Sequence, residues 1–167
     1  MKPMGMIETR KFIRLAAVLL LSLFLLSCSN SGRINDVMVM DDTRDVLVYA
    51  RLQSLLKEDT ENLIHAGVAV SCTFYVNFYQ ERSSWFDHRL SSQVVRNTIK
   101  YDNIKKNIYV KTHLNGKVID AAQFTDFDSA VSSLIDLNGI SVAHVGKLRK
   151  TEKYYVEIKA KVEKDEH

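Results

Sequence analysis

Acidic, imidazole and phenol side chains stand next to one another in two short stretches of this sequence. Asp87 and His88 follow Trp85, and Asp102 follows Tyr101. A histidine that is oriented by a carboxylate can act as a general base. A second interpretation needs no catalysis, because an aspartate in a turn accepts hydrogen bonds from nearby backbone N–H groups. We favour the second interpretation for both stretches, and an enzyme using Asp87 and His88 remains the less favoured alternative.

The sequence offers little sign of a metal or cofactor site. Its five histidines are dispersed, at His65, His88, His113, His144 and His167. The spacings His-x-His and His-Glu-x-x-His, which place two metal ligands on one element, do not occur. Glycine-rich phosphate loops and the Gly-x-Ser-x-Gly turn of serine hydrolases are also missing. We therefore expect a domain that has no metal, no cofactor and no enzymatic activity.

Cys28 is the residue with the most distinctive chemistry. It follows a basic segment and thirteen uncharged residues, 15–27, which is shorter than the roughly 20 residues that span a bilayer. The run ends Leu25-Leu26-Ser27-Cys28 and resembles a bacterial lipobox, whose cysteine thiol takes a diacylglycerol and whose freed amine is acylated. Two or more acyl chains make a stable anchor. We predict a lipoprotein signal peptide over 1–27; an ordinary cleaved signal or a retained anchor is the alternative.

The predicted signal also accounts for the positive charge of the chain. The whole chain has 23 basic and 20 acidic side chains, and residues 1–27 hold four of the basic ones and one of the acidic ones. The mature chain therefore has 19 of each sign. Nucleic acid is a poor candidate partner, because its binding depends on a clustered positive surface.

One long strand is expected to organise the domain. Over residues 68–82, apolar and small or polar residues alternate with period two, which is typical of a strand with one buried face. The apolar series is Val68, Val70, Cys72, Phe74, Val76 and Phe78. The opposite series contains Tyr75, Asn77 and Tyr79, which we expect either to be covered by a helix or to form an exposed face for a partner. Cys72 belongs to the apolar series and is expected to be a small buried hydrophobe.

The remaining elements are expected at the spacing of antiparallel hairpins. A flexible tether over 28–45, with a weak edge strand at 37–40, leads into a single domain over 46–167. Strands are predicted over 46–52, 89–101, 108–114 and 118–124, with Asn115-Gly116 as a tight hairpin turn. Two further strands, 140–148 and 154–162, are expected to form a hairpin. One helix is predicted over 58–66, ended by Gly67, and a second is predicted to begin after Asp126 and end at Asn138-Gly139.

These elements predict a mainly β fold with two short helices, in the α+β class. The favoured architecture is an antiparallel β-sandwich of about seven strands. The alternative is a single bent antiparallel sheet with helices on one face.

Several stretches resemble a known bacterial envelope family, the domain of unknown function 4390. They are Gly67 at a helix end, Phe78-Tyr-Gln-Glu-Arg-Ser-Ser-Trp-Phe-Asp87 and Tyr101-Asp-Asn-Ile-Lys-Lys-Asn-Ile-Tyr-Val110. The resemblance covers roughly residues 46–162, and it departs from the family at Ala69, where proline is usual. It implies a secreted or anchored single domain without an established activity. Its markers, which we expect to have structural roles, are Arg82, Trp85, Asp87, Tyr101, Asp102 and Tyr109.

The sequence therefore predicts a non-enzymatic, lipid-anchored envelope protein that faces the periplasm and binds another envelope protein. Ser29 after Cys28 slightly favours the outer membrane. The alternative is a carrier of a lipid or other apolar ligand held between a bent sheet and its helices. Two basic runs, Lys105-Lys106 and Lys147 to Lys150, are expected to be solvated, or else to rest on anionic headgroups.

Overall fold

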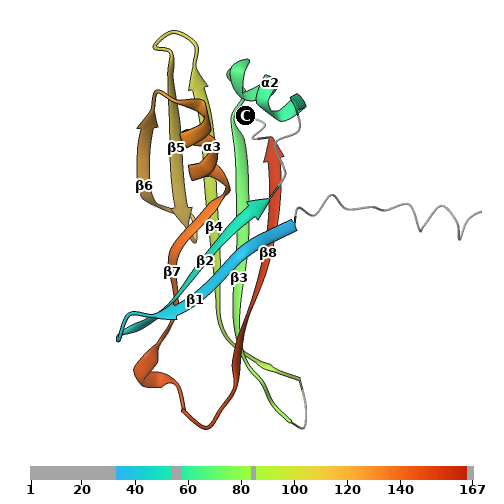
Figure 1. Cartoon of the computed structure of the whole chain (residues 1–167), viewed down its shortest axis with the longest axis vertical. Helices are drawn as coiled ribbons and strands as arrows, with labels where there is room; N and C mark the ends of the chain where they lie inside the picture. Colours follow the sequence, from blue (N-terminus) through green and yellow to red (C-terminus); the bar gives the residue numbers. More distant parts are fainter. Residues whose placement is uncertain (1–32, 54–57, 84–85, 165–167) are drawn as a thin grey trace, which may run out of the picture. The chain divides into compact units, whose positions relative to one another are not determined.

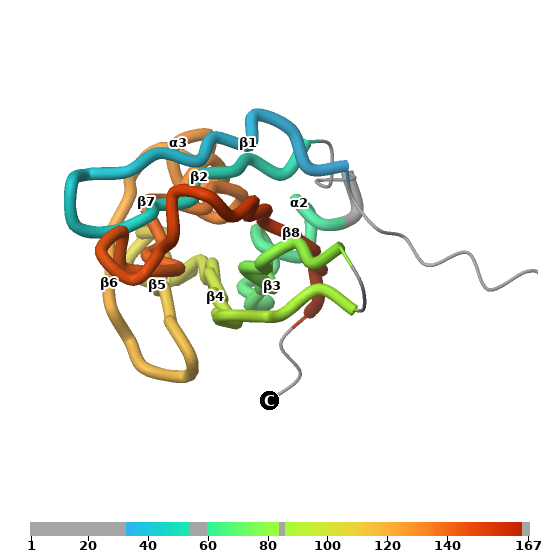
Figure 2. The backbone as a smooth tube through the Cα atoms, turned by 90° about the horizontal axis from the view of Figure 1, so that it is seen from below, coloured from blue at the N-terminus to red at the C-terminus, as the bar shows by residue number. Residues whose placement is uncertain are grey.

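The computed structural model describes residues 33–53, 58–83 and 86–164. Within them, eight strands form two antiparallel sheets that pack face to face (Figures 1 and 2). The predicted sandwich is confirmed, because the described strands form two sheets and not the single sheet of the alternative. The predicted Cys28 anchor and Trp85 lie outside the described residues.

The larger sheet has five strands in the order β6-β5-β4-β3-β8. Its members are β3 (Val70–Gln80), β4 (His88–Asp102), β5 (Asn107–Leu114), β6 (Lys117–Phe124) and β8 (Tyr154–Lys164). The smaller sheet has the order β1-β2-β7, with β1 (Arg33–Asp41), β2 (Asp45–Gln53) and β7 (Asp136–His144). The 3-10 turn η1 (Val145–Lys147) follows β7.

The predicted long strand is confirmed as β3, the strand that pairs with both β4 and β8. Its apolar series from Val70 to Phe78 is at most 3% exposed and faces the core between the sheets. Alternating apolar residues of β2, from Val46 to Leu52, belong to the same core. Cys72 is buried there as predicted, and burial raises the pKa of its thiol to about 12.

The two helices complete the core beside the smaller sheet. Helix α2 (Glu58–His65) begins at the predicted residue and ends one residue before its predicted end, and Gly67 follows it with φ +85°. Helix α3 (Phe127–Ile135) packs against β4 and β5 and begins at Asp126, whose carboxylate accepts the backbone N–H of Ser129 at 2.8 Å. His65 at the end of α2 stacks on Phe127 with ring centroids 4.5 Å apart.

Three predicted features differ from the structure. Residues 33–41 of the predicted tether form β1, which pairs with β2, so the domain begins before residue 46. The hairpin expected from 140–148 and 154–162 is wrong, since β7 pairs with β2 and β8 pairs with β3. This arrangement gives β3 a partner on each side. Helix α3 ends at Ile135, and Gly139 instead lies at a bulge of β7 with φ +59°.

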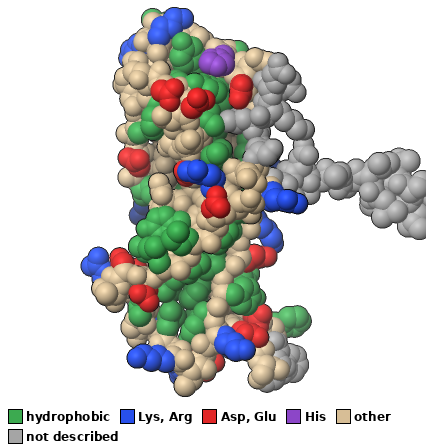
Figure 3. Space-filling view, in the orientation of Figure 1, with side chains coloured by type: hydrophobic (Ala, Val, Ile, Leu, Met, Phe, Trp, Pro, Cys, Tyr) green, Lys and Arg blue, Asp and Glu red, His purple; other side chains and the backbone are tan. Residues whose placement is uncertain are grey.

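Strand β1 is an edge strand of the smaller sheet. Its residues Val37 to Met40 are 42–53% exposed, and a bulge interrupts its pairing between Asn35 and Met38. The weak edge strand predicted at 37–40 is therefore part of a real strand. Hydrophobic side chains are visible over β1 and beside it on this side of the domain (Figure 3).

Candidate binding face

The outer face of the five-stranded sheet carries the tyrosines that the sequence analysis singled out. Tyr75 is 41% exposed, and Tyr79 stacks on Tyr155 of β8 with ring centroids 5.1 Å apart. Between them, the Asn77 side chain donates to Glu157 at 3.2 Å. The first of the two expectations, cover by a helix, is not met at Tyr75. We call Tyr75, Asn77, Tyr79 and Tyr155 the tyrosine platform.

Asp87 holds the end of this platform. Its carboxylate accepts the backbone N–H of Arg82 at 3.0 Å and the phenol O–H of Tyr155 at 2.8 Å. These two hydrogen bonds, the Arg82 one first, lower the pKa of Asp87, and the same phenol contact raises the pKa of Tyr155 to about 12. The predicted turn role of Asp87 fits this geometry, whereas the contact with Tyr155 is one that sequence reasoning missed.

The Asp87–Tyr155 hydrogen bond predicts a specific pH dependence. The native pKa of Tyr155 lies above its ordinary value of 10, so the bond contributes stability below pH 10 and this contribution is lost as the pH rises toward 12. The lowered pKa of Asp87 gives a contribution that is present above pH 3.8 and lost as the pH falls below it. We expect Asp87→Asn to bring the Tyr155 pKa back toward 10.

The measurement is an NMR titration of the phenolic carbons in protein labelled at tyrosine Cζ, with Tyr155 assigned by Tyr155→Phe. Asp128→Asn, which changes a carboxyl group on α3, is the matched control and should leave the Tyr155 pKa near 12. An unchanged Tyr155 titration in Asp87→Asn would contradict the assigned contact.

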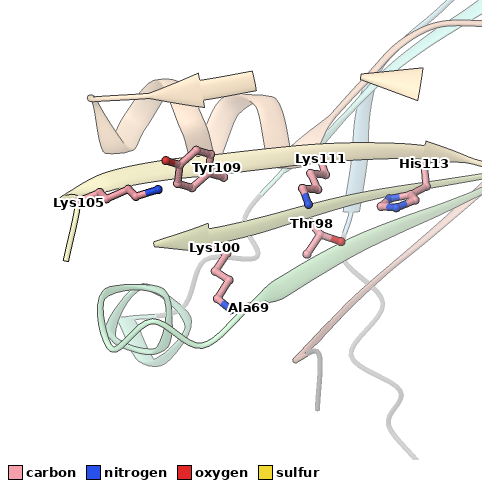
Figure 4. A pocket seen from close by; sticks show the side chains of 7 residues that line it. All are labelled: Ala69, Thr98, Lys100, Lys105, Tyr109, Lys111 and His113. Atoms are coloured by element: carbon pink, nitrogen blue, oxygen red, sulfur yellow. The ribbon is translucent and has the colours of Figure 1, made fainter. Parts of the chain in front are cut away.

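A hollow of about 630 Å³ lies on the same face, toward the β4–β5 turn. Three strands or their ends form it, and cross-strand pairing brings Lys100 opposite Tyr109 and Thr98 opposite Lys111. Figure 4 shows side chains of β4 and β5 lying along one side of the sheet, with Lys105 in the turn that leads into β5. We call this site the lysine hollow; it is lined by Ala69, Thr98, Lys100, Lys105, Tyr109, Lys111 and His113.

The charge of the lysine hollow is poorly balanced. Among the described residues, the ion pairs within 4.0 Å do not include Lys100, Lys105 or Lys111. Asp102 is the nearby carboxylate, and its oxygen accepts the backbone N–H groups of Ile104 and Lys105 at 2.9 and 3.0 Å. These bonds, with the Lys105 one foremost, and the positive charges of Lys105 and Lys100 lower the pKa of Asp102. The Asp102 carboxylate thus responds to two of the three ammonium groups, those of Lys105 and Lys100.

The other predicted site residues have separate positions. Tyr101 packs against the core and meets His65 edge-on, and Asp102 opens the turn as predicted. Tyr109 lines the lysine hollow instead of joining the core. His88 is exposed at the first position of β4, while the hydrogen bonds described for Asp87 go to Arg82 and Tyr155.

Sequence reasoning missed most of the lysine hollow. Lys105 belonged to a noted basic run, but Lys100, Lys111 and His113 were not singled out. The sequence did contain a pattern that could have grouped them. Lys100 lies on one strand of a predicted pair, and Lys111 and His113 lie two residues apart, and so on one face, of the other strand. In addition, Nδ1 of His113 is buried and lacks a hydrogen-bond partner in the described part of the chain.

The described residues lack two further features that would point to a function. They contain no cluster of three or more histidine, cysteine, aspartate or glutamate side chains that could hold a metal ion. They also contain no helix with the length and apolar character needed to cross a membrane.

Comparison with known proteins places the chain in a family. No curated protein and no solved structure matches it. A family model described as a domain of unknown function, DUF4390, matches residues 29–166, which include every described strand and helix. The resemblance noted in the sequence is thereby confirmed: the chain belongs to the DUF4390 family.

Proposed function

We propose that this chain is a non-enzymatic, lipid-anchored protein of the bacterial envelope that binds another envelope protein through the tyrosine platform. The single observation that carries the proposal is the open platform on the outer face of the five-stranded sheet. Tyr75 and Tyr155 are 41% and 43% exposed, although both are large aromatic residues.

The composition and geometry of the platform favour a protein partner. Tyrosine offers a large contact area with one polar end, and it is enriched in protein interfaces. Stacking on Tyr79 and the hydrogen bond to Asp87 hold the Tyr155 ring in place. A pre-positioned ring loses less conformational entropy when a partner binds.

The test is site-specific photocrosslinking in cells. A photoreactive amino acid at Tyr75 should give a discrete adduct with one envelope protein, and the adduct should disappear when Tyr155→Arg is introduced as well. Val118, which is 58% exposed on β6, provides the matched control position. Equal adducts at Tyr75 and Val118, or adducts that survive Tyr155→Arg, would oppose the proposal.

The anchor is tested separately from the partner. Cys28→Ser should abolish incorporation of labelled fatty acid and release the protein from the membrane fraction. If the variant still incorporates the label, the acyl chains are attached elsewhere and the anchor proposal fails.

The two alternatives receive less support. A carrier with its ligand between sheet and helices would need interior room, whereas Phe74, Val76 and Leu134 there are 0% exposed and packed in one core. An enzyme using Asp87 and His88 would need the two side chains to converge, whereas Asp87 bonds to Arg82 and Tyr155.

A further inference from the structure

We infer that the lysine hollow and the neighbouring β4–β5 turn bind the anionic headgroups of a phospholipid membrane. This inference is independent of the tyrosine platform and of a lipid at Cys28, because it rests on side chains at one end of the five-stranded sheet. It assigns this end of the domain to the membrane surface.

The first support is local charge. The mature chain is formally neutral, yet Lys100, Lys105 and Lys111 line one hollow, with the carboxylate of Asp102 as the near counter-charge. No described carboxylate lies within 4.0 Å of these three ammonium groups. Uncompensated ammonium groups at a surface attract the phosphates of anionic lipids, by an amount that falls off within a Debye length.

The second support is an apolar tip beside the lysines. Ile104 lies in the turn between β4 and β5 and is 93% exposed, and Lys105 directly after it lines the hollow. Exposing nearly a whole isoleucine side chain to water is unfavourable. An apolar tip with a basic collar matches the layered chemistry of a membrane interface, where acyl chains lie beneath charged headgroups.

The third support is the lining of the hollow. Besides the ammonium groups, it presents the Tyr109 ring, the Ala69 methyl group and the carbon stems of the lysines, with the Thr98 hydroxyl and the His113 ring as polar groups. A phosphate with its attached glycerol has the same mixture of charge and carbon. The volume of about 630 Å³ is within the usual range of small-ligand sites.

An acidic segment of a partner protein would neutralise the lysines but would not cover the apolar side chain in the β4–β5 turn. It offers carboxylates to the lysines, while Ile104, which is 93% exposed in the turn, would stay in water. The membrane accounts for both features with one occupant. It would also leave the tyrosine platform free, since Tyr75 lies six residues along β3 from Ala69, roughly 20 Å away.

The experiment measures vesicle binding by the chain without residues 1–28, so that no acyl chain contributes. This part contains every described strand and helix and one complete core, within the compact unit Ser31–His167. The probes are phosphatidylcholine vesicles with and without about one-third phosphatidylglycerol, at low salt. We expect binding to the anionic vesicles alone, and its loss as salt is raised.

Two variants and their matched controls locate the binding. Lys100→Gln with Lys105→Gln and Lys111→Gln should weaken binding about 100-fold, from the usual contribution of a lysine near an anionic surface. The control is Lys147→Gln with Lys150→Gln and Lys153→Gln, an equal change of charge in and after η1, at the other end of the sheet (Figure 1). It should change binding less than threefold.

The apolar tip has its own control. Ile104→Ser should weaken vesicle binding severalfold, and Phe86→Ser, at a residue that is 90% exposed before β4, should not. Melting curves of all variants should match wild type, because every replaced side chain lies at the surface.

Each other outcome overturns the inference. Equal losses in the two lysine variants would mean that only overall charge matters. Equal binding to neutral vesicles would remove the role of the headgroup. Binding of an acidic peptide or of inorganic phosphate with the same lysine dependence, but without vesicle binding, would identify the hollow as a site for a protein segment or a free anion.

Discussion

Replacing Phe74 with alanine should lower the free energy of unfolding by about 3–5 kcal/mol. Phe74 is 0% exposed and is the largest fully buried side chain among the described residues. It lies at the middle of β3, where it pairs with Val95 on β4 and Ala160 on β8. Both neighbouring strands are hydrogen-bonded to β3, so the backbone has little freedom to move inward and fill the cavity.

Tyr75→Ala, at the next position of the same strand, is the matched control for Phe74→Ala. Tyr75 points to the outer face and is 41% exposed, so its removal leaves no closed cavity. We expect a loss of about 1 kcal/mol or less from reduced strand propensity. The measurement is urea unfolding of the chain without residues 1–28, with the slope of the transition compared between variants. Similar losses for both variants would show that the two faces of β3 are wrongly assigned.

Replacing Asn97 should have the second large effect. Asn97 is 2% exposed on β4, and its side-chain amide donates to the carbonyl oxygens of Ser133, Leu134 and Asp136 at 3.2, 3.1 and 2.9 Å. These carbonyls lie at the C-terminal end of α3, where the helix leaves carbonyl oxygens without helical partners. Asn97→Ala should cost about 2–4 kcal/mol, because buried acceptors lose their donor and a small cavity forms.

Asn97→Asp separates the hydrogen bonds from the packing. The shape is nearly unchanged, but an ionised carboxylate would face three carbonyl oxygens, and we expect a loss of about 3–5 kcal/mol at pH 7. Lowering the pH should shrink the difference from wild type, since a protonated carboxyl group can donate to one carbonyl. Gln123→Ala, on the exposed side of β6, should melt like wild type. A variant Asn97→Asp as stable as wild type at pH 7 would contradict the observed contacts.

The local features of the fold were determined by the sequence. Alternation along β3 identified its buried face, because neighbouring side chains of a strand point to opposite sides whatever its partner is. Asn115 and Gly116 both have positive φ, at 51° and 81°, as the predicted hairpin turn requires. Asp126 and Gly67 marked helix ends in the same way. Each of these signals acts over a few residues and needs no distant partner.

The tertiary structure alone decided which strands are neighbours and where the candidate site lies. Alternation in β8 shows that one of its faces is exposed to solvent. It does not distinguish β7 from β3 as the partner of β8, because the same face of β8 would be buried in either pairing. The order of the larger sheet then placed Ala69, Lys100 and Lys111 around one hollow, although they are up to 42 residues apart in the chain. It also brought Tyr155 beside Tyr79 and Asp87. Sequence spacing carries no information about such contacts, because they depend on strand pairing over long distances along the chain.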